Sequence, residues 1–154
     1  MVFDPRPELR DRAAFKAWHR SRTAWTDGLD YSEPSNASAG LQNWFREIIE
    51  IFPPLNGRLR PADFATNEWV TDYSIASDLI FVAFSSDKGG VAYEKTRHLA
   101  ATHGVGFYDS SGDGSVWFPT AAKTLELAHA GDKSKSGEVN LEKLLSQLGW
   151  RAKP

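Results

Sequence analysis

The chain has 154 residues, of which 41% are hydrophobic and 25% charged, and its net charge at pH 7 is −2. These values are typical of one soluble globular domain and exclude a disordered or fibrous chain. Cysteine is absent, which excludes disulfides, thiolate metal sites and cysteine nucleophiles and fits a reducing cytosol. The apolar runs are too short to span a bilayer and the start lacks a signal-peptide pattern, so we expect a cytoplasmic protein.

Charge is unevenly distributed along the chain. Residues 27–80 hold nine acidic and three basic side chains, whereas residues 1–26 hold six basic and three acidic ones. Nucleic-acid binders usually show a basic patch interleaved with aromatic residues, and here basic residues are concentrated only in the first predicted helix and in the tail. We therefore expect no direct binding to nucleic acid.

The first third of the chain predicts a short strand and two helices. Residues 2–3 are typical of a strand end, residues 7–25 of a helix, and residues 27–39 of a loop rich in polar and turn-forming residues. The second helix is the clearest in the chain, because its apolar residues recur every three or four positions and two prolines follow them. This stripe consists of Leu41, Trp44, Phe45, Ile48, Ile49 and Phe52.

The middle of the chain alternates between loop, strand and helix. Residues 53–67 are rich in turn formers, and a loop of this length is a candidate functional surface. Residues 70–75 and 79–84 are rich in β-branched and aromatic residues and predict two strands. Helical spacing then continues over residues 91–103, where Gly104 stands in the position of a left-handed helix cap.

The last third predicts a hairpin followed by helices. Residues 105–108 and 115–118 alternate between small or polar and large apolar side chains, so residues 109–114 form the tip between two strands. Residues 121–130 favour a short helix, and residues 140–148 favour a last helix that begins at an asparagine cap.

Together these elements predict an α+β fold with a single mixed or antiparallel sheet of four to five strands and helices packed on it. We expect residues 1–119 to form the core domain and residues 120–154 to form a C-terminal helical extension of the same domain.

The tip of the predicted hairpin resembles the first half of a calcium-binding loop, because oxygen-bearing side chains alternate with glycine in residues 109–114. The twelfth position is Thr120 instead of a bidentate glutamate, and strands flank the segment, so a hairpin turn is favoured. Residues 85–90 lie between a strand and a helix but match no phosphate-binding motif. We expect no metal and no cofactor.

Catalytic signatures are weak. No serine lies in a Gly-x-Ser-x-Gly elbow, and no two histidines have the spacing of a zinc-binding helix. His103 is the best isolated histidine, although its position favours an interaction with the end of its helix over catalysis. We expect a protein that is not an enzyme. A small hydrolase or metal-dependent enzyme that uses His103 with Asp109 or Asp113 remains the alternative.

Five residues combine negative charge with aromatic side chains near the long loop: Asp63, Glu68, Trp69, Asp72 and Tyr73. Such a face can attract a basic partner through charge and anchor it with an aromatic ring. A merely solvated face is the simpler interpretation of the same pattern. We take these five residues as the predicted partner-binding set.

Three segments carry a family resemblance: Trp44–Asn56 (WFREIIEIFPPLN), Thr71–Ile75 (TDYSI) and His103–Asp109 (HGVGFYD). Together they resemble a family of small bacterial proteins whose members are similar to immunity proteins of polymorphic, contact-dependent or type VI-delivered toxins. The resemblance covers residues 2–119 and assigns no residue a role. It implies a cytoplasmic protein that binds and neutralises a cognate toxin with a basic surface; an adaptor domain of a secretion system is a further alternative.

Overall fold

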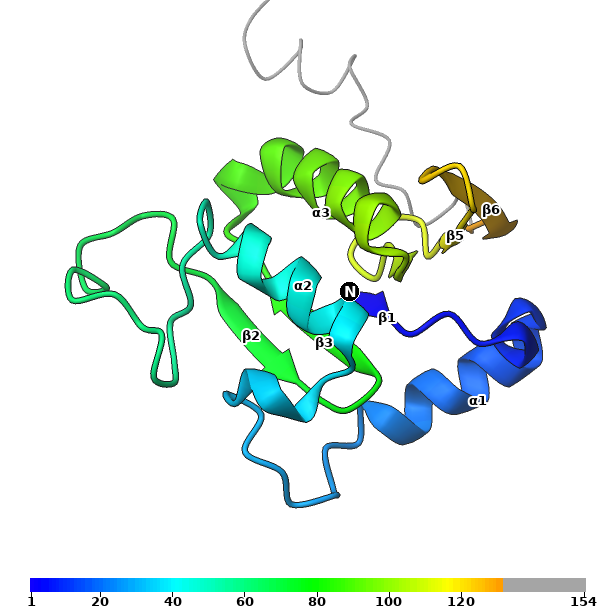
Figure 1. Ribbon diagram of the computed structural model, residues 1–154, viewed down its shortest axis with the longest axis horizontal. Coiled ribbons are helices and arrows are strands. Elements are labelled where there is room, and N and C mark those ends of the chain that lie inside the picture. Colours follow the sequence, from blue (N-terminus) through cyan, green and yellow to red (C-terminus); the bar gives the residue numbers. More distant parts are fainter. Residues whose placement is uncertain (132–154) are drawn as a thin grey trace, which may run out of the picture.

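Six antiparallel strands form one sheet in the computed structural model, which describes residues 1–131, and their order is β2-β3-β1-β4-β5-β6 (Figure 1). The strands are β1 (Val2–Phe3), β2 (Asp72–Ile75), β3 (Leu79–Ala83), β4 (Gly106–Tyr108), β5 (Val116–Pro119) and β6 (Leu125–His129). The α-helices are α1 (Arg12–Arg22), α2 (Ala39–Ile48) and α3 (Gly89–His103), and short 3-10 turns lie at Pro7–Arg10, Pro34–Asn36 and Ser86–Lys88. The predicted α+β class is confirmed, with six strands instead of four to five.

The two-residue strand β1 joins the two halves of the sheet. Val2 lies opposite Ile80 of β3 and Phe107 of β4, and Phe3 lies opposite Leu79 and Gly106. Because successive side chains of a strand point to opposite faces, Val2 and Phe3 enter different layers of the core, and both are fully buried. The sheet is therefore packed on both faces around its shortest strand.

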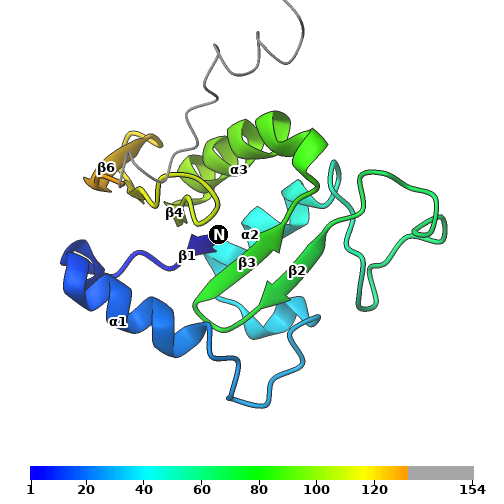
Figure 2. The same ribbon diagram turned by 180° about the vertical axis from the view of Figure 1, so that it is seen from behind.

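Helices α2 and α3 cover one face of the sheet, as the two opposite views show (Figures 1 and 2). The stripe predicted for the second helix forms this layer, and Trp44 and Ile48 have no exposed surface. The Trp44 indole donates a hydrogen bond to the main-chain oxygen of Thr96 in α3, at 3.3 Å, so its one polar atom is satisfied inside the core. The periodicity of the sequence thus identified the residues that this helix contributes to the core.

Helix α1 packs on the other face, where it contacts Phe3 and the turn between β2 and β3. The carboxylate of Asp78 in that turn accepts hydrogen bonds from the Trp18 indole at 2.9 Å and from Nε of Arg22 at 2.7 Å. Arg6 contributes a third contact to the same carboxylate at 3.4 Å. One anion therefore ties three side chains of the N-terminal segment to the sheet.

The segment predicted as one helix over residues 7–25 is divided. A 3-10 turn ends at Arg10, and α1 begins after Asp11, whose carboxylate accepts a hydrogen bond from the main-chain N–H of Ala14 at 2.8 Å. An aspartate in this position satisfies an N–H group that has no partner within the helix. The local capping signal at Asp11 therefore prevails over the longer apolar periodicity.

The short helix predicted over residues 121–130 is wrong, because β6 occupies this segment. Leu125 lies opposite Pro119 and Leu127 opposite Trp117, so the segment extends the sheet beyond β5. The predicted last helix over residues 140–148 lies outside the described residues. Within residues 1–131, no helix is long and apolar enough to cross a membrane.

Candidate functional site

The segment between α2 and β2 is a closed loop that projects from the edge of the sheet (Figure 1). Its two ends are joined by main-chain hydrogen bonds, from Thr71 to Pro53 at 2.8 Å and from Leu55 to Thr71 at 2.9 Å. Leu55 is 39% exposed and Leu59 42%, so the loop presents apolar side chains to solvent. A closed loop with exposed apolar residues is a frequent form of binding surface.

Trp69 is the anchored aromatic residue of this loop. Its ring packs against the fully buried Phe52, with ring centroids 5.5 Å apart, and Nζ of Lys88 lies 4.9 Å from its centroid. Its main-chain N–H donates to the Asn67 side chain at 3.0 Å. Trp69 is nevertheless 38% exposed. One part of the Trp69 ring is therefore packed against the protein, and the rest is exposed to solvent.

Acidic groups surround Lys88 beside Trp69. Nζ of Lys88 lies 2.8 Å from a carboxylate oxygen of Asp87 and 3.8 Å from one of Glu68. The hydrogen bond with Asp87 raises the pKa of the Lys88 ammonium, so this group stays charged. Two carboxylates and one cation leave this cluster negative, and the Glu68 side chain is 82% exposed.

Asp63 and Asp72 complete the predicted acidic set. Asp63 is exposed in the loop and accepts a hydrogen bond from the Asn67 side chain at 3.3 Å. Asp72 is exposed at the start of β2 and accepts one from the Asn56 side chain at 3.1 Å.

The loop also holds two exposed cations, of which Arg58 pairs with Glu33 and Arg60 lies over the ring of Phe64. We call the exposed acidic and large apolar side chains of this region the loop face. The loop face consists of Leu55, Leu59, Asp63, Glu68, Trp69 and Asp72.

Tyr73, the fifth residue of the predicted set, belongs to the core. It is 6% exposed, its hydroxyl donates to the main-chain oxygen of Phe52 at 2.7 Å, and its ring meets Phe45 edge to face at 5.1 Å. Burial raises the pKa of its phenol. The alternation of β2 turns Asp72 outward and Tyr73 inward, so Tyr73 supports the loop face without being part of it.

The residues of the enzymatic alternative make separate local contacts. Nε2 of His103 lies 3.0 Å from a carboxylate oxygen of Glu47, at the distance of an ion pair but without the alignment of a hydrogen bond. Asp109 accepts from the N–H of Gly112 and Asp113 from that of Ser115, both within the β4–β5 connection. The pocket that Asp109 lines does not include His103. These contacts support turns and helix packing.

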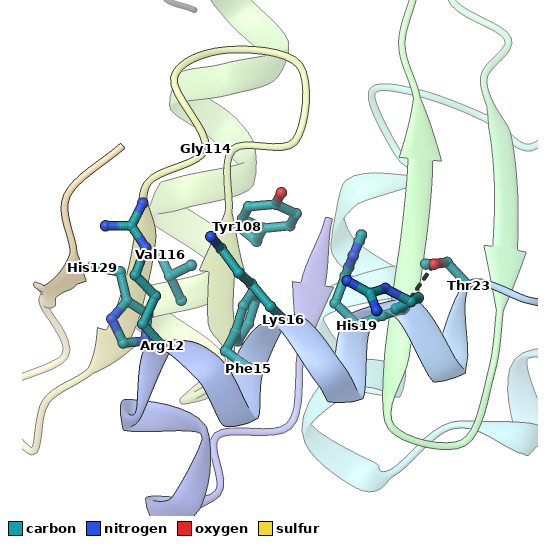
Figure 3. Close-up of a pocket in the computed structure, with 10 residues that line it drawn as sticks. Arg12, Phe15, Lys16, His19, Thr23, Tyr108, Gly114, Val116 and His129 are labelled. Atoms are coloured by element: carbon teal, nitrogen blue, oxygen red, sulfur yellow. Dashed lines mark hydrogen bonds between the residues drawn. The ribbon is translucent and has the colours of Figure 1, made fainter. Parts of the chain in front are cut away.

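A second hollow, which the sequence did not predict, lies between α1 and the β4–β5 hairpin (Figure 3). Its volume is about 310 Å³. Its polar lining includes three cations of α1 and three ring side chains: Arg12, Lys16, Arg20, His19, Tyr108 and His129. In the close-up, Arg12 and Lys16 rise from α1 on the side of the hairpin, and Lys16 extends toward the ring of Tyr108. We call this hollow the α1 pocket.

Aromatic rings form the floor of the α1 pocket. Phe15 is buried there, and the His19 ring meets Tyr108 edge to face at 5.0 Å. Burial lowers the pKa of His19 below its ordinary value, which favours the neutral imidazole at pH 7. His129 is fixed by a contact of its Nε2 with the main-chain oxygen of Leu9 at 3.2 Å.

An adjoining hollow of about 340 Å³ shares His19, Thr23 and Tyr108 with the α1 pocket. Its further lining includes Trp25 and Phe81, which are both half-buried. The two hollows therefore adjoin at these three residues, and we call the side lined by the cations of α1 the cationic end and the side lined by Trp25 and Phe81 the aromatic end.

Comparison of the chain with protein-family models, with curated proteins and with solved structures finds no match.

Proposed function

We propose that this protein acts by binding another protein through the loop face. The main observation behind the proposal is that Trp69 is 38% exposed although Phe52 and Lys88 hold its ring in place. A preorganised aromatic side chain loses little conformational entropy on binding, and such residues dominate the energetics of protein interfaces. Leu55 and Leu59 add apolar area on the same loop.

Charge on the loop face supports a basic partner. Asp63, Glu68 and Asp72 are all exposed, and the chain between residues 27 and 80 has three times as many acidic as basic side chains. Carboxylates around an aromatic anchor accelerate encounter with a basic surface and disfavour acidic competitors. The partner of the proposal is therefore a protein with a basic surface.

More specifically, we propose that the partner is a cognate bacterial toxin and that the chain is its cytoplasmic immunity protein. The resemblance of Trp44–Asn56, Thr71–Ile75 and His103–Asp109 to immunity proteins of polymorphic and type VI-delivered toxins supports this more specific proposal. Such a protein protects the cell by occupying the toxin, so it requires a binding surface and no catalytic group. The loop face supplies that surface.

Co-expression with the product of the adjacent gene tests the proposal. We expect the chain to bind this product and to protect cells from its toxicity. Binding without protection favours the adaptor domain over the immunity protein, and absence of binding contradicts the proposed partner.

A charge-reversal variant tests the surface itself. The double variant Glu68→Lys/Asp72→Lys places two cations against a basic partner and is expected to weaken binding at least about tenfold. Glu94→Lys is the control for reversal of one charge outside the loop face and is compared with the single variant Glu68→Lys, because Glu94 is exposed on α3 and takes part in no ion pair among residues 1–131. Equal affinity for the double variant and the unmodified chain, with unfolding midpoints unchanged, excludes the loop face.

A further inference from the structure

We infer that the α1 pocket and the adjoining hollow bind a nucleoside phosphate, with the phosphates at the cationic end and the base at the aromatic end. This site is independent of the proposed partner surface. It lies beside α1, whereas the loop that carries the loop face projects from the opposite end of the molecule (Figures 1 and 2).

The cationic end consists of Arg12, Lys16 and Arg20, which are four residues apart in α1 and therefore share one side of the helix. Like charges at this spacing repel each other and destabilise a helix. Within residues 1–131, none of the three forms an ion pair with a carboxylate. A stripe that destabilises its own helix and lines a hollow is suited to an anionic ligand.

Acidic side chains near the hollow are used in other contacts. Asp109 and Asp113 of the β4–β5 connection accept main-chain hydrogen bonds from Gly112 and Ser115, at 2.9 and 2.8 Å. Asp11 accepts from the N–H of Ala14. None of these carboxylates is part of the lining of the α1 pocket. The lining of this end therefore carries three cations and no carboxylate.

The cations are of the types that bind phosphate. Arginine presents parallel N–H groups that match two phosphate oxygens, and lysine provides a compact positive charge. Arg12 and Arg20 lie about one helical turn on either side of Lys16, so all three positive charges attract the phosphates of a ligand in this hollow. A ligand with a single carboxylate would leave part of the positive charge of this stripe uncompensated.

The aromatic end favours a ligand that contains a planar ring. Tyr108 belongs to both hollows, and Trp25 and Phe81 lie beyond it. Aromatic side chains bind a nucleobase by stacking, an interaction that tolerates every base. With about 310 and 340 Å³, the two hollows also have the dimensions of small-molecule sites in proteins.

Isothermal titration of the full chain with ADP, pyrophosphate and adenosine tests the inference. We expect ADP to bind more tightly than either of the other two, because only ADP occupies both ends. Pyrophosphate that binds as tightly as ADP contradicts a role of the aromatic end. Absence of ADP binding at millimolar concentration overturns the inference as a whole.

Two lysine variants separate the pocket from general surface charge. Lys16→Gln removes one charge-assisted contact and is expected to weaken ADP binding about tenfold. Lys95→Gln is the matched control, because Lys95 is exposed on α3 and outside both hollows. Equal losses in the two variants, with unchanged far-ultraviolet circular dichroism, overturn the site. Fold integrity does not depend on either lysine, since both side chains are exposed.

Discussion

Asp78 links helix α1 and Arg6 to the turn between β2 and β3. Its side chain is 18% exposed and accepts hydrogen bonds from Trp18, Arg22 and Arg6. Asp78→Asn removes the negative charge, which leaves Arg22 without its counter-ion and Arg6 with Glu8 alone. We expect the free energy of unfolding to fall by about 2–3 kcal/mol, measured by urea denaturation.

Glu94→Gln is the control for this prediction, since Glu94 is an exposed carboxylate of α3. Its free energy of unfolding should change by less than about 0.5 kcal/mol. A similarly small change in Asp78→Asn would show that α1 is held by the apolar contacts of Phe15 and Trp18 with Phe3 alone.

Asp4 makes the stability depend on pH. Burial is the main cause that raises the pKa of its carboxyl, the nearby Asp78 acts in the same direction, and the hydrogen bond from Ser38 opposes both. An acid whose pKa is raised on folding stabilises the fold at low pH, and this contribution is lost as pH rises from the unfolded value through the folded one.

The pH dependence is tested with Asp4→Asn, which keeps an oxygen that can accept from Ser38 but cannot ionise. We expect the stability of this variant, relative to the unmodified chain, to improve between pH 4 and pH 7 in urea denaturation. A difference that is constant over this range contradicts the raised pKa of Asp4.

At the scale of elements, the pairing of β1 with β4 requires a glycine. A methyl group at Gly106 would lie 2.3 Å from the ring of Phe3. That ring cannot retreat, because Phe15 and Phe118 pack against it at 5.4 Å each. We expect Gly106→Ala to destabilise the protein by about 1–3 kcal/mol in thermal or urea unfolding.

Gly90→Ala is the matched control for Gly106→Ala. Gly90 lies in the first turn of α3, and a methyl group there meets no atom within 4 Å. The same substitution should therefore stabilise the protein by about 0.4–1 kcal/mol, because alanine restricts the unfolded chain. Destabilisation at both positions would show that the loss at Gly106 is not a steric effect of Phe3.

The periodic helices and five of the six strands were predictable from the sequence, whereas β6 was not. Helix α2 carries four buried residues on its predicted stripe, and Gly104 adopts the predicted left-handed cap with φ of 68°. Residues 125–129, of sequence LELAH, contain helix-forming residues, yet they form β6 because β5 offers a free edge. Tertiary pairing prevails over local propensity in this segment.

The candidate sites were predictable only in part, because some of their residues come from segments that are distant in the sequence. The acidic and aromatic composition of the loop marked Trp69 and Asp72, and the alternation of β2 could have identified Tyr73 as buried. The basic stripe of α1 was visible as a charged helix side, but Tyr108 reaches it from a strand far along the chain. A pocket built from such distant segments has no local signal in the sequence.

At the scale of the whole molecule, the acidic and the basic surfaces lie at different ends. The loop that carries the acidic loop face projects at one end, and the cationic stripe of α1 lies toward the other (Figures 1 and 2). The net charge is only −2, but the separation of acidic from basic side chains gives the two ends of the molecule opposite charge. The two proposed binding events therefore use different surfaces of the molecule.

The topology of the sheet also sets the order of folding. Strand β1 starts at residue 2, whereas its partners β3 and β4 start at residues 79 and 106, so its pairing closes long loops. The β2–β3 and β4–β5 hairpins form from neighbouring segments. Because loop closure precedes the gain from distant contacts, we expect β1 to join the sheet after the transition state.

Stopped-flow kinetics of Phe3→Leu test this order. Phe3 is fully buried, and its replacement should lower stability by about 1–2 kcal/mol. If β1 pairs late, the loss appears as a roughly tenfold faster unfolding rate with an almost unchanged folding rate, which corresponds to a φ-value below about 0.3. Val82→Ala, which lies opposite Tyr73 in the local β2–β3 hairpin and outside the β1 register, should show a larger φ-value. Folding that slows as much in Phe3→Leu as in Val82→Ala would place β1 in the folding nucleus and contradict the late closure of the sheet.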